Sequence, residues 1–268
     1  NIETHSAMFG FFYCAYNITL MILLSFTILF IFEIKTVMKK LILILVLSIC
    51  HSCDFAESIL LNNQGMEKYE NGLYVEAIDL FNQSINLDSS NGLVYSNRGL
   101  AKLEVGNYND AIIDCSNAIL LDPSLAEAYN NRGLAYYYSD DYKSALEDYN
   151  KAIQLDPLLS IAYNNRGLIQ NNYQLALDDY NKAIQLDPLL AIAYNNRGMT
   201  KYESENFRDA LNDFNKAIQL DPLLAIAYNN RGYCYYNIEQ YDDACNDLNY
   251  ATNLGYAVNQ DDYSIICD

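Results

Sequence analysis

The strongest constraint on the fold is an internal repeat with a period of 34 residues. The tripeptide Asn-Arg-Gly recurs five times, and its glycines are spaced by 34, 34, 31 and 34 residues: Gly99, Gly133, Gly167, Gly198 and Gly232. Gly65 lies another 34 residues before Gly99. One unit of this length does not bury its own apolar faces, so neighbouring units must stack and share a continuous core.

Each unit has the pattern of two amphipathic helices. Apolar residues recur at i, i+3, i+4 and i+7 in two stripes, and a polar turn such as 139–141 separates the stripes. Asp-Pro follows the second stripe at 122–123, 156–157, 187–188 and 221–222. Because Pro cannot continue a helix, this dipeptide marks the end of the second helix. Position 8 of each unit is Gly and position 20 is Ala, which allows the two helices to approach closely.

This pattern resembles the tetratricopeptide repeat. The resemblance covers 58–258 as six repeats: 58–91, 92–125, 126–159, 160–190, 191–224 and 225–258. It implies an all-α fold, a right-handed α-solenoid of six helix-turn-helix repeats, with a short C-terminal cap over 259–268. Twelve repeat helices are expected.

The segment before the repeats has the pattern of an export signal. Met38-Lys39-Lys40 is basic, 41–49 is apolar, and a small residue precedes Cys53. This resembles a bacterial lipoprotein signal, which implies a signal peptide over 38–52, lipidation of Cys53 and a linker over 53–57. Cys50 is the alternative modified residue.

Residues 1–37 form either an upstream flank or a membrane segment. An apolar run over 11–32 is long enough to cross a bilayer, which takes about 20 residues. With the export signal acting, the repeats lie in the cell envelope, as a periplasmic or surface lipoprotein. Without it, they belong to a cytoplasmic adaptor that is anchored to the membrane.

Charge and histidine content exclude several functions. The chain has 34 acidic and 16 basic side chains and a net charge of −18, so no nucleic-acid partner is expected, because nothing would neutralise the phosphates. Both histidines, His5 and His51, precede the repeats. The repeats therefore lack the imidazole that most hydrolytic and zinc sites need. We expect no enzyme activity, no metal site and no cofactor.

Two charges recur together in repeats 2 to 6. Position 7 is Arg98, Arg132, Arg166, Arg197 and Arg231, and position 23 is Asp114, Asp148, Asp179, Asp213 and Asp247. Repeat 1 has Gln64 and Leu80 instead. Because the Arg and the Asp are present together in repeats 2 to 6 and absent together in repeat 1, we predict an Arg–Asp pair between two helices. The pair lies within a repeat or across a repeat boundary and sets the register of the helices. Two independent solvated charges are the alternative.

Two features interrupt the regular array. Repeat 4 is three residues short between Gly167 and Tyr173, which predicts a shorter first helix or turn and a local bend. At the cap, Cys245 lies ten residues before Gly255 and Cys267 twelve after it. A hairpin that turns at Gly255 brings both thiols to the same level, which predicts a Cys245–Cys267 disulfide in an oxidising compartment.

The resemblance also indicates a binding surface, because in this family the first helix of each repeat lines the concave face. Position 6 is Asn in all six repeats: Asn63, Asn97, Asn131, Asn165, Asn196 and Asn230. This resembles the asparagine ladder of O-GlcNAc transferases, which grips a peptide backbone. A structural role for this Asn is the alternative. Tyr137, Tyr202 and Tyr236 add amphipathic contact area to the expected groove.

The partner is expected to be another protein or an extended peptide. The cations of the family's carboxylate clamp are missing, since Asn62, Glu127 and Asn131 stand at three of the clamp positions. A neutral or basic segment therefore suits the groove better than an acidic one. The leading hypothesis is a non-enzymatic scaffold, exported and lipid-anchored; the alternatives are the cytoplasmic adaptor and a carbohydrate-binding envelope protein.

Overall fold

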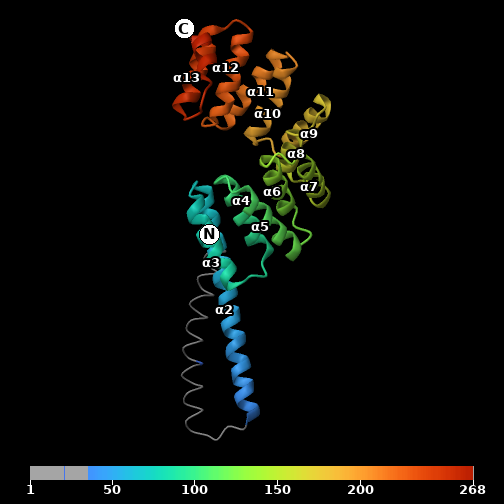
Figure 1. Ribbon diagram of the computed structural model, residues 1–268, viewed down its shortest axis with the longest axis vertical. Coiled ribbons are helices and arrows are strands. Elements are labelled where there is room, and N and C mark those ends of the chain that lie inside the picture. The colour runs from blue at the N-terminus through green and yellow to red at the C-terminus, as the bar shows by residue number, and fades with distance from the viewer. Residues whose placement is uncertain (1–20, 22–35, 268) are drawn as a thin grey trace. The chain divides into compact units, whose positions relative to one another are not determined.

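The computed structural model describes residue 21 and residues 36–267, and this part of the chain contains helices and no strands (Figure 1). The helices up to residue 138 are α2 (Thr36–Glu70), α3 (Tyr74–Leu87), α4 (Gly92–Glu104), α5 (Tyr108–Leu121) and α6 (Ala126–Tyr138). Those beyond are α7 (Tyr142–Leu155), α8 (Ser160–Gly167), α9 (Tyr173–Leu186), α10 (Ala191–Glu203), α11 (Phe207–Leu220), α12 (Ala225–Asn237), α13 (Tyr241–Asn253) and α14 (Gln260–Cys267).

These helices pair as the repeats predict. The twelve repeat helices are α2 to α13, and α14 follows them as the cap. The chain divides into two compact units, with the boundary between Ser139 and Asp140. Within each unit every helix packs on the next, and the first helices of consecutive repeats also touch, as in α4 with α6 and α10 with α12. The predicted all-α repeat fold is confirmed; the handedness of its superhelix stays a prediction.

Small residues set the distance between the two helices of a repeat. The alanines at position 20 are no more than 5% exposed: Ala77, Ala111, Ala145, Ala176, Ala210 and Ala244. A Cβ on Gly198 would lie 2.8 Å from Cε1 of Phe214, which is too close for two carbon atoms. In repeats 1, 4 and 5, glycine at position 8 therefore allows the aromatic ring of the second helix to lie against the first helix.

The second helices end at the Asp-Pro dipeptides. The backbone of Asp156 is extended, with φ −128° and ψ 96°, and its Oδ1 accepts the backbone N–H of Leu158 at 2.9 Å. The same bond recurs between Leu189 and Asp187. The aspartate thus organises the turn while the proline prevents the helix from continuing.

Helix α2 is longer than a repeat helix. It begins at Thr36 and continues to Glu70, so the predicted signal segment 38–52 and the predicted linker 53–57 are helical and continuous with repeat 1. Leu43, Ile44 and Leu47 are 58–62% exposed. No helix in the described residues is long and apolar enough to cross a membrane. The predicted span over 11–32 lies outside the described residues except for residue 21.

The cap is held on the last repeat by several contacts. Val258 and Ile266 are buried in one cluster with Leu248. The structure joins Cys245 and Cys267 in a disulfide, with the two Cα atoms 5.1 Å apart. These contacts cover the apolar end of the array, which a terminal repeat otherwise leaves open to water.

Repeat 4 departs from the others in its first helix. Helix α8 has 8 residues, whereas α4, α6, α10 and α12 each have 13. Residues 168–172 form the turn to α9. The predicted shortening of the first helix is confirmed.

Candidate binding face on the first helices

The asparagines at positions 5 and 6 bind each other across repeat boundaries. In the second unit, Nδ2 of Asn196 donates to Oδ1 of Asn164 at 3.0 Å. One repeat later, Nδ2 of Asn230 donates to Oδ1 of Asn195 at 3.0 Å. Within a repeat, Nδ2 of Asn195 lies 3.1 Å from Oδ1 of Asn196. The two columns of amides therefore form a hydrogen-bonded ladder that joins successive first helices.

The first unit has the same ladder. Nδ2 of Asn97 donates to Oδ1 of Asn62 at 2.9 Å, and Nδ2 of Asn131 to Oγ of Ser96 at 3.2 Å. Asn63, which has no preceding repeat, is exposed. The ladder ends at repeat 6, where Oδ1 of Asn229 is buried and has no hydrogen-bond partner among the described residues.

These bonds give position 6 the structural role that the sequence left as the alternative. Asn131 is 6% exposed and Asn165 is 4% exposed, whereas Asn97, Asn196 and Asn230 are half-buried. The role of this column in binding a peptide stays a prediction. A peptide that binds there would use the amide donors and acceptors that are not already hydrogen-bonded within the ladder.

The predicted Arg–Asp pair is confirmed in repeats 2, 4, 5 and 6, where it lies within the repeat. In repeat 5, Nε of Arg197 lies 2.9 Å from Oδ2 of Asp213, and Nη2 lies 2.6 Å from Oδ1. Both side chains are mostly buried, at 18% and 6% exposure. The planar guanidinium thus binds the carboxylate through two parallel hydrogen bonds.

Each of these arginines also reaches the preceding repeat. Nη1 of Arg197 donates to Oδ1 of Asn181 at 2.8 Å, and Nη1 of Arg231 donates to Asn215 at 2.6 Å. The guanidinium carbon of Arg197 lies 5.4 Å from the ring centroid of Tyr194. One arginine therefore joins two second helices and a tyrosine. This partner at position 25, which the sequence pattern did not predict, recurs as Asn82, Asn150, Asn181 and Asn215.

The predicted binding tyrosines are half-buried on the first helices. The ring centroids of Tyr202 and Phe207 are 5.5 Å apart, and the hydroxyl of Tyr202 accepts a hydrogen bond from Nδ2 of Asn237 at 2.8 Å. Burial raises the pKa of Tyr202, so its hydroxyl stays protonated at neutral pH. Tyr236 packs on Tyr241 in the same way. Tyr137 packs on Tyr138 in the first unit.

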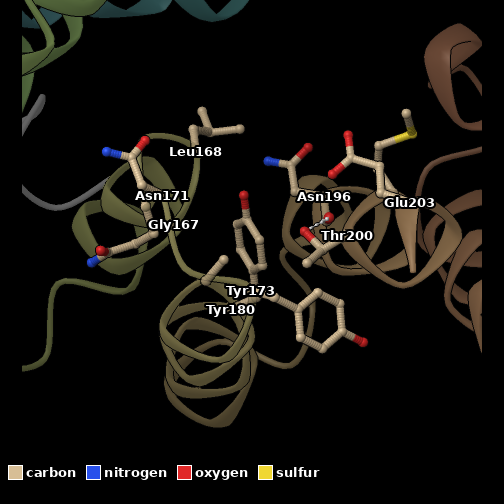
Figure 2. Close-up of a pocket in the computed structure, with 11 residues that line it drawn as sticks. Gly167, Leu168, Asn171, Tyr173, Tyr180, Asn196, Thr200 and Glu203 are labelled. Carbon is tan, nitrogen blue, oxygen red and sulfur yellow. Dashed lines mark hydrogen bonds between the residues drawn. The ribbon is translucent and has the colours of Figure 1, made fainter.

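A pocket of about 310 Å³ opens beside the shortened helix of repeat 4. Its wall on one side is the α8–α9 turn, and on the other side it is α10 (Figure 2). The lining residues are Gly167, Leu168, Gln170, Asn171, Tyr173, Ala176, Tyr180, Asn196, Met199, Thr200 and Glu203. Of the predicted site residues only Asn196 lines it. The three-residue gap in repeat 4 is the sequence signal that marks its position.

The remaining predicted residues lie outside this face. Cys53 is half-buried within α2, and its thiol is in a disulfide. Lipidation of Cys53, which requires the reduced thiol, stays a prediction. The disulfide cysteines lie on α13 and α14, at the cap. The described residues contain no group of three or more His, Cys, Asp or Glu side chains that could hold a metal ion.

Comparison with known proteins agrees with this architecture. Models of the tetratricopeptide repeat family match residues 126–157, 191–222 and 214–246. No curated protein matches the chain. The chain therefore contains tetratricopeptide repeats.

Solved structures show the same fold at low sequence identity. Pseudomonas aeruginosa pilF is 24% identical, with a TM-score of 0.57, and the match covers 64% of this chain and 79% of pilF. A thermophilic tetratricopeptide repeat protein of Thermus thermophilus is 16% identical, with a TM-score of 0.61 and coverage of 67% and 99%. The Cut9–Hcn1 structure gives 20% identity, a TM-score of 0.64 and coverage of 79% and 43%. At these identities the likeness concerns the fold alone.

Proposed function

We propose that this protein is a non-enzymatic scaffold that binds a polypeptide segment along the first helices of its repeats. The observation that carries the proposal is the repeated presentation of half-buried tyrosines and amides on consecutive first helices, as in α10 and α12. Such side chains offer contact area and hydrogen bonds at low entropy cost. The tetratricopeptide fold supports the same function.

The charge of the chain favours a neutral or basic partner. The net charge is −18, and Glu203 is the charged residue of the pocket beside α8. The cations of this face are engaged internally: Lys201 pairs with Asp213 at 2.7 Å, and Lys102 pairs with Asp114 at 2.8 Å. An acidic segment would meet repulsion with no compensating cation.

The proposal is tested by measuring the affinity of the full chain for fluorescently labelled ten-residue peptides. Three sets of peptides are used: neutral, basic and acidic. We expect dissociation constants in the micromolar range for neutral or basic peptides, because each hydrogen bond contributes only about 0.5–1.5 kcal/mol net. Tyr202→Ala with Tyr236→Ala should weaken binding about tenfold or more. Leu189→Ala, in a turn and 75% exposed, is the matched control and should leave binding unchanged.

The ladder requires its own variant. Asn131→Ala with Asn165→Ala removes the predicted peptide contacts at two repeats. Unchanged affinity in this variant would show that the asparagine column serves the fold only. Failure of every peptide set to bind the native chain would contradict the scaffold function.

We further propose that the protein is exported and lipid-anchored through Cys53. The basic, apolar and small residues of 38–52 support this, as do the exposed apolar side chains of Leu43, Ile44 and Leu47. Intact-mass analysis of the chain expressed from Met38 in a bacterium, combined with fractionation, tests it. An acylated N-terminal Cys53 in the membrane fraction, lost in Cys53→Ser, is the expected result.

The opposite result identifies the alternative. An uncleaved, unmodified chain in the membrane fraction would support an adaptor on the cytoplasmic side. The same chain in the soluble cytoplasmic fraction would exclude export through 38–53. The anchor over 11–32 precedes Met38, so it is tested by fractionation of the chain expressed from residue 1. Neither result alters the test of peptide binding.

A further inference from the structure

Repeat 4 lacks an aromatic contact that other repeats have. The residue at position 12 packs on the ring at position 17, with centroids 5.3 Å apart in Tyr69–Tyr74, 5.5 Å in Tyr202–Phe207 and 5.6 Å in Tyr236–Tyr241. The three missing residues of repeat 4 are positions 11 to 13. Tyr173 at position 17 therefore has no such neighbour, and it is 42% exposed. The pocket beside α8 occupies the place of the missing side chain.

The floor of this pocket is rigid. Tyr180 is 3% exposed, and a Cβ on Gly167 would lie 2.6 Å from its Cε1, so the ring and the helix end are in direct contact. Ala176 of the same helix, α9, is 5% exposed. These buried residues, which are in direct contact, close the cavity from below. A stable cavity with one open side is suited to receive a side chain from a ligand.

The mouth of the pocket is polar and acidic. Glu203 is its charged residue and is exposed, and Asn171, Asn196 and Thr200 add neutral polar groups (Figure 2). Figure 2 shows Leu168 and Asn171 on the side of the α8–α9 turn, opposite Asn196, Thr200 and Glu203. The nearby carboxylate of Asp179 is already bound by Arg166 and by Gln170. Glu203 is thus the carboxylate left for a ligand.

We propose that this pocket binds an arginine side chain of the partner polypeptide, which deepens the scaffold function and rests on it. A guanidinium is planar and always charged, so it stacks on an aromatic ring while pairing with a carboxylate. This chain already uses that arrangement: Arg166 lies 5.5 Å from the ring of Tyr163 while binding Asp179. In the pocket, Tyr173 and Glu203 supply the same two groups.

The pocket is large enough to receive one arginine side chain. Sites for whole small molecules have volumes of about 300–1,000 Å³. At about 310 Å³ this pocket is at the lower limit of that range. An arginine of an extended segment that lies along α8 and α10 fits the volume and keeps its backbone on the first-helix face.

Small amino-acid amides test the pocket without a known partner. The probes are N-acetylarginine amide, the neutral isostere N-acetylcitrulline amide, and N-acetyltyrosine amide, added to the full chain in detergent micelles. The readout is the methyl signal of ¹³C-labelled Met199, which lines the pocket. The methyl of Met66, in the first unit, is the internal control.

We expect the arginine probe to shift the Met199 signal saturably, with affinity at least fivefold higher than that of the citrulline probe. Glu203→Gln should remove this difference, and since Glu203 is exposed, the variant should fold normally. Equal binding of arginine and citrulline probes would contradict the role of charge. Tighter binding of the tyrosine probe would show that the pocket takes an aromatic side chain instead.

An insertion provides a second variant. Lys-Tyr-Glu placed after Ile169 copies positions 11 to 13 of repeat 5, restores 34 residues and fills the cavity. This variant should lose the Met199 shift, with helicity retained by circular dichroism. If it binds the arginine probe as the native chain does, the site lies elsewhere and the proposal is wrong.

The outcomes separate this proposal from the scaffold function. Peptides that bind the first-helix face with no preference for arginine, combined with an unchanged Met199 signal, would overturn the pocket alone. A Met199 shift with the arginine probe, in a chain that binds no peptide, would support the pocket and overturn the scaffold.

Discussion

Arg197 and Asp213 are joined by two parallel hydrogen bonds, of 2.9 Å from Nε to Oδ2 and 2.6 Å from Nη2 to Oδ1. The pair lies between the two helices of repeat 5, and the third nitrogen of the arginine binds Asn181 of the preceding repeat. Repetition of this arrangement fixes the register of neighbouring repeats with one side chain per repeat. It also makes the array sensitive to loss of one partner.

Removal of the arginine should therefore be costly. Arg197→Leu leaves the carboxylate of Asp213 buried with only Lys201 beside it, and we expect the free energy of unfolding to fall by about 3–5 kcal/mol in chemical denaturation. Arg208→Leu, at an exposed position on α11, is the control and should change it by less than about 0.5 kcal/mol. An equal effect of both substitutions would show that the pair is solvated.

Repeat 1 suggests how to compensate this loss. It has Gln64 and Leu80 where the other repeats have Arg and Asp. The double variant Arg197→Gln with Asp213→Leu should therefore recover most of the stability that Arg197→Leu loses, because the buried carboxylate is removed and Lys201, at 19% exposure, can extend its ammonium into solvent. Additive loss in the double variant would contradict this interpretation of repeat 1.

The cap disulfide should contribute to stability chiefly at the C-terminal end. Cys245 and Cys267 are separated by 22 residues, and closing a loop of that size stabilises a fold by about 3 kcal/mol. In Cys245→Ser with Cys267→Ser we expect faster amide hydrogen exchange in α14 and little change in α10. Cys115→Ser, at a buried cysteine in the first unit, should leave exchange in α14 unaltered.

High pH should release the same cap. The hydroxyl of Tyr233 donates to Oδ2 of Asp262 at 2.8 Å, and burial, followed by this bond, raises the pKa of Tyr233 from 10.0 to about 12. The raised pKa favours the neutral phenol in the folded state. Its stabilisation is complete below pH 10 and is lost as the pH rises through 12.

The test compares native protein with Tyr233→Phe by exchange in α14 between pH 9 and 12. The pKa of Cys234 is also raised, to about 11, by burial, so both proteins should lose some stability over this range. The variant should be less stable at pH 9 and should show the smaller decline. Parallel pH profiles of the two proteins would exclude Tyr233 as the titrating group.

The asparagine ladder should contribute to stability independently of any ligand. Asn196→Ala leaves Oδ1 of Asn164, a residue that is 2% exposed, without its donor, and a buried unsatisfied oxygen costs about 1–3 kcal/mol. Asn63→Ala, at the exposed start of the ladder, should cost less than about 0.5 kcal/mol. Thermal unfolding of both variants distinguishes the ladder from a column of independent surface amides.

Much of this fold could be predicted from the chain because the repeat supplies six versions of one pattern. Glycine at position 8, alanine at position 20 and Asp-Pro at the helix ends are local requirements for close packing and termination, so they appear directly as residue types. The Arg–Asp pair could be predicted because both members vanish together in repeat 1. The Asn at position 25, which binds the arginine of the next repeat, could not be predicted in this way, because Asn also recurs at positions 5 and 6 and its residue type does not indicate a partner.

The sequence by itself determined the class of fold, the period of the repeats, the shortened fourth repeat and the two residues of the cap disulfide, since each rests on spacing along one chain. Only the tertiary structure decided what the asparagine column bonds to and where the missing turn leaves a cavity. Both depend on atoms of adjacent repeats that approach to within 3 to 4 Å. Periodicity along the chain predicts which helices are neighbours, but the contacts of their side chains follow from packing in three dimensions.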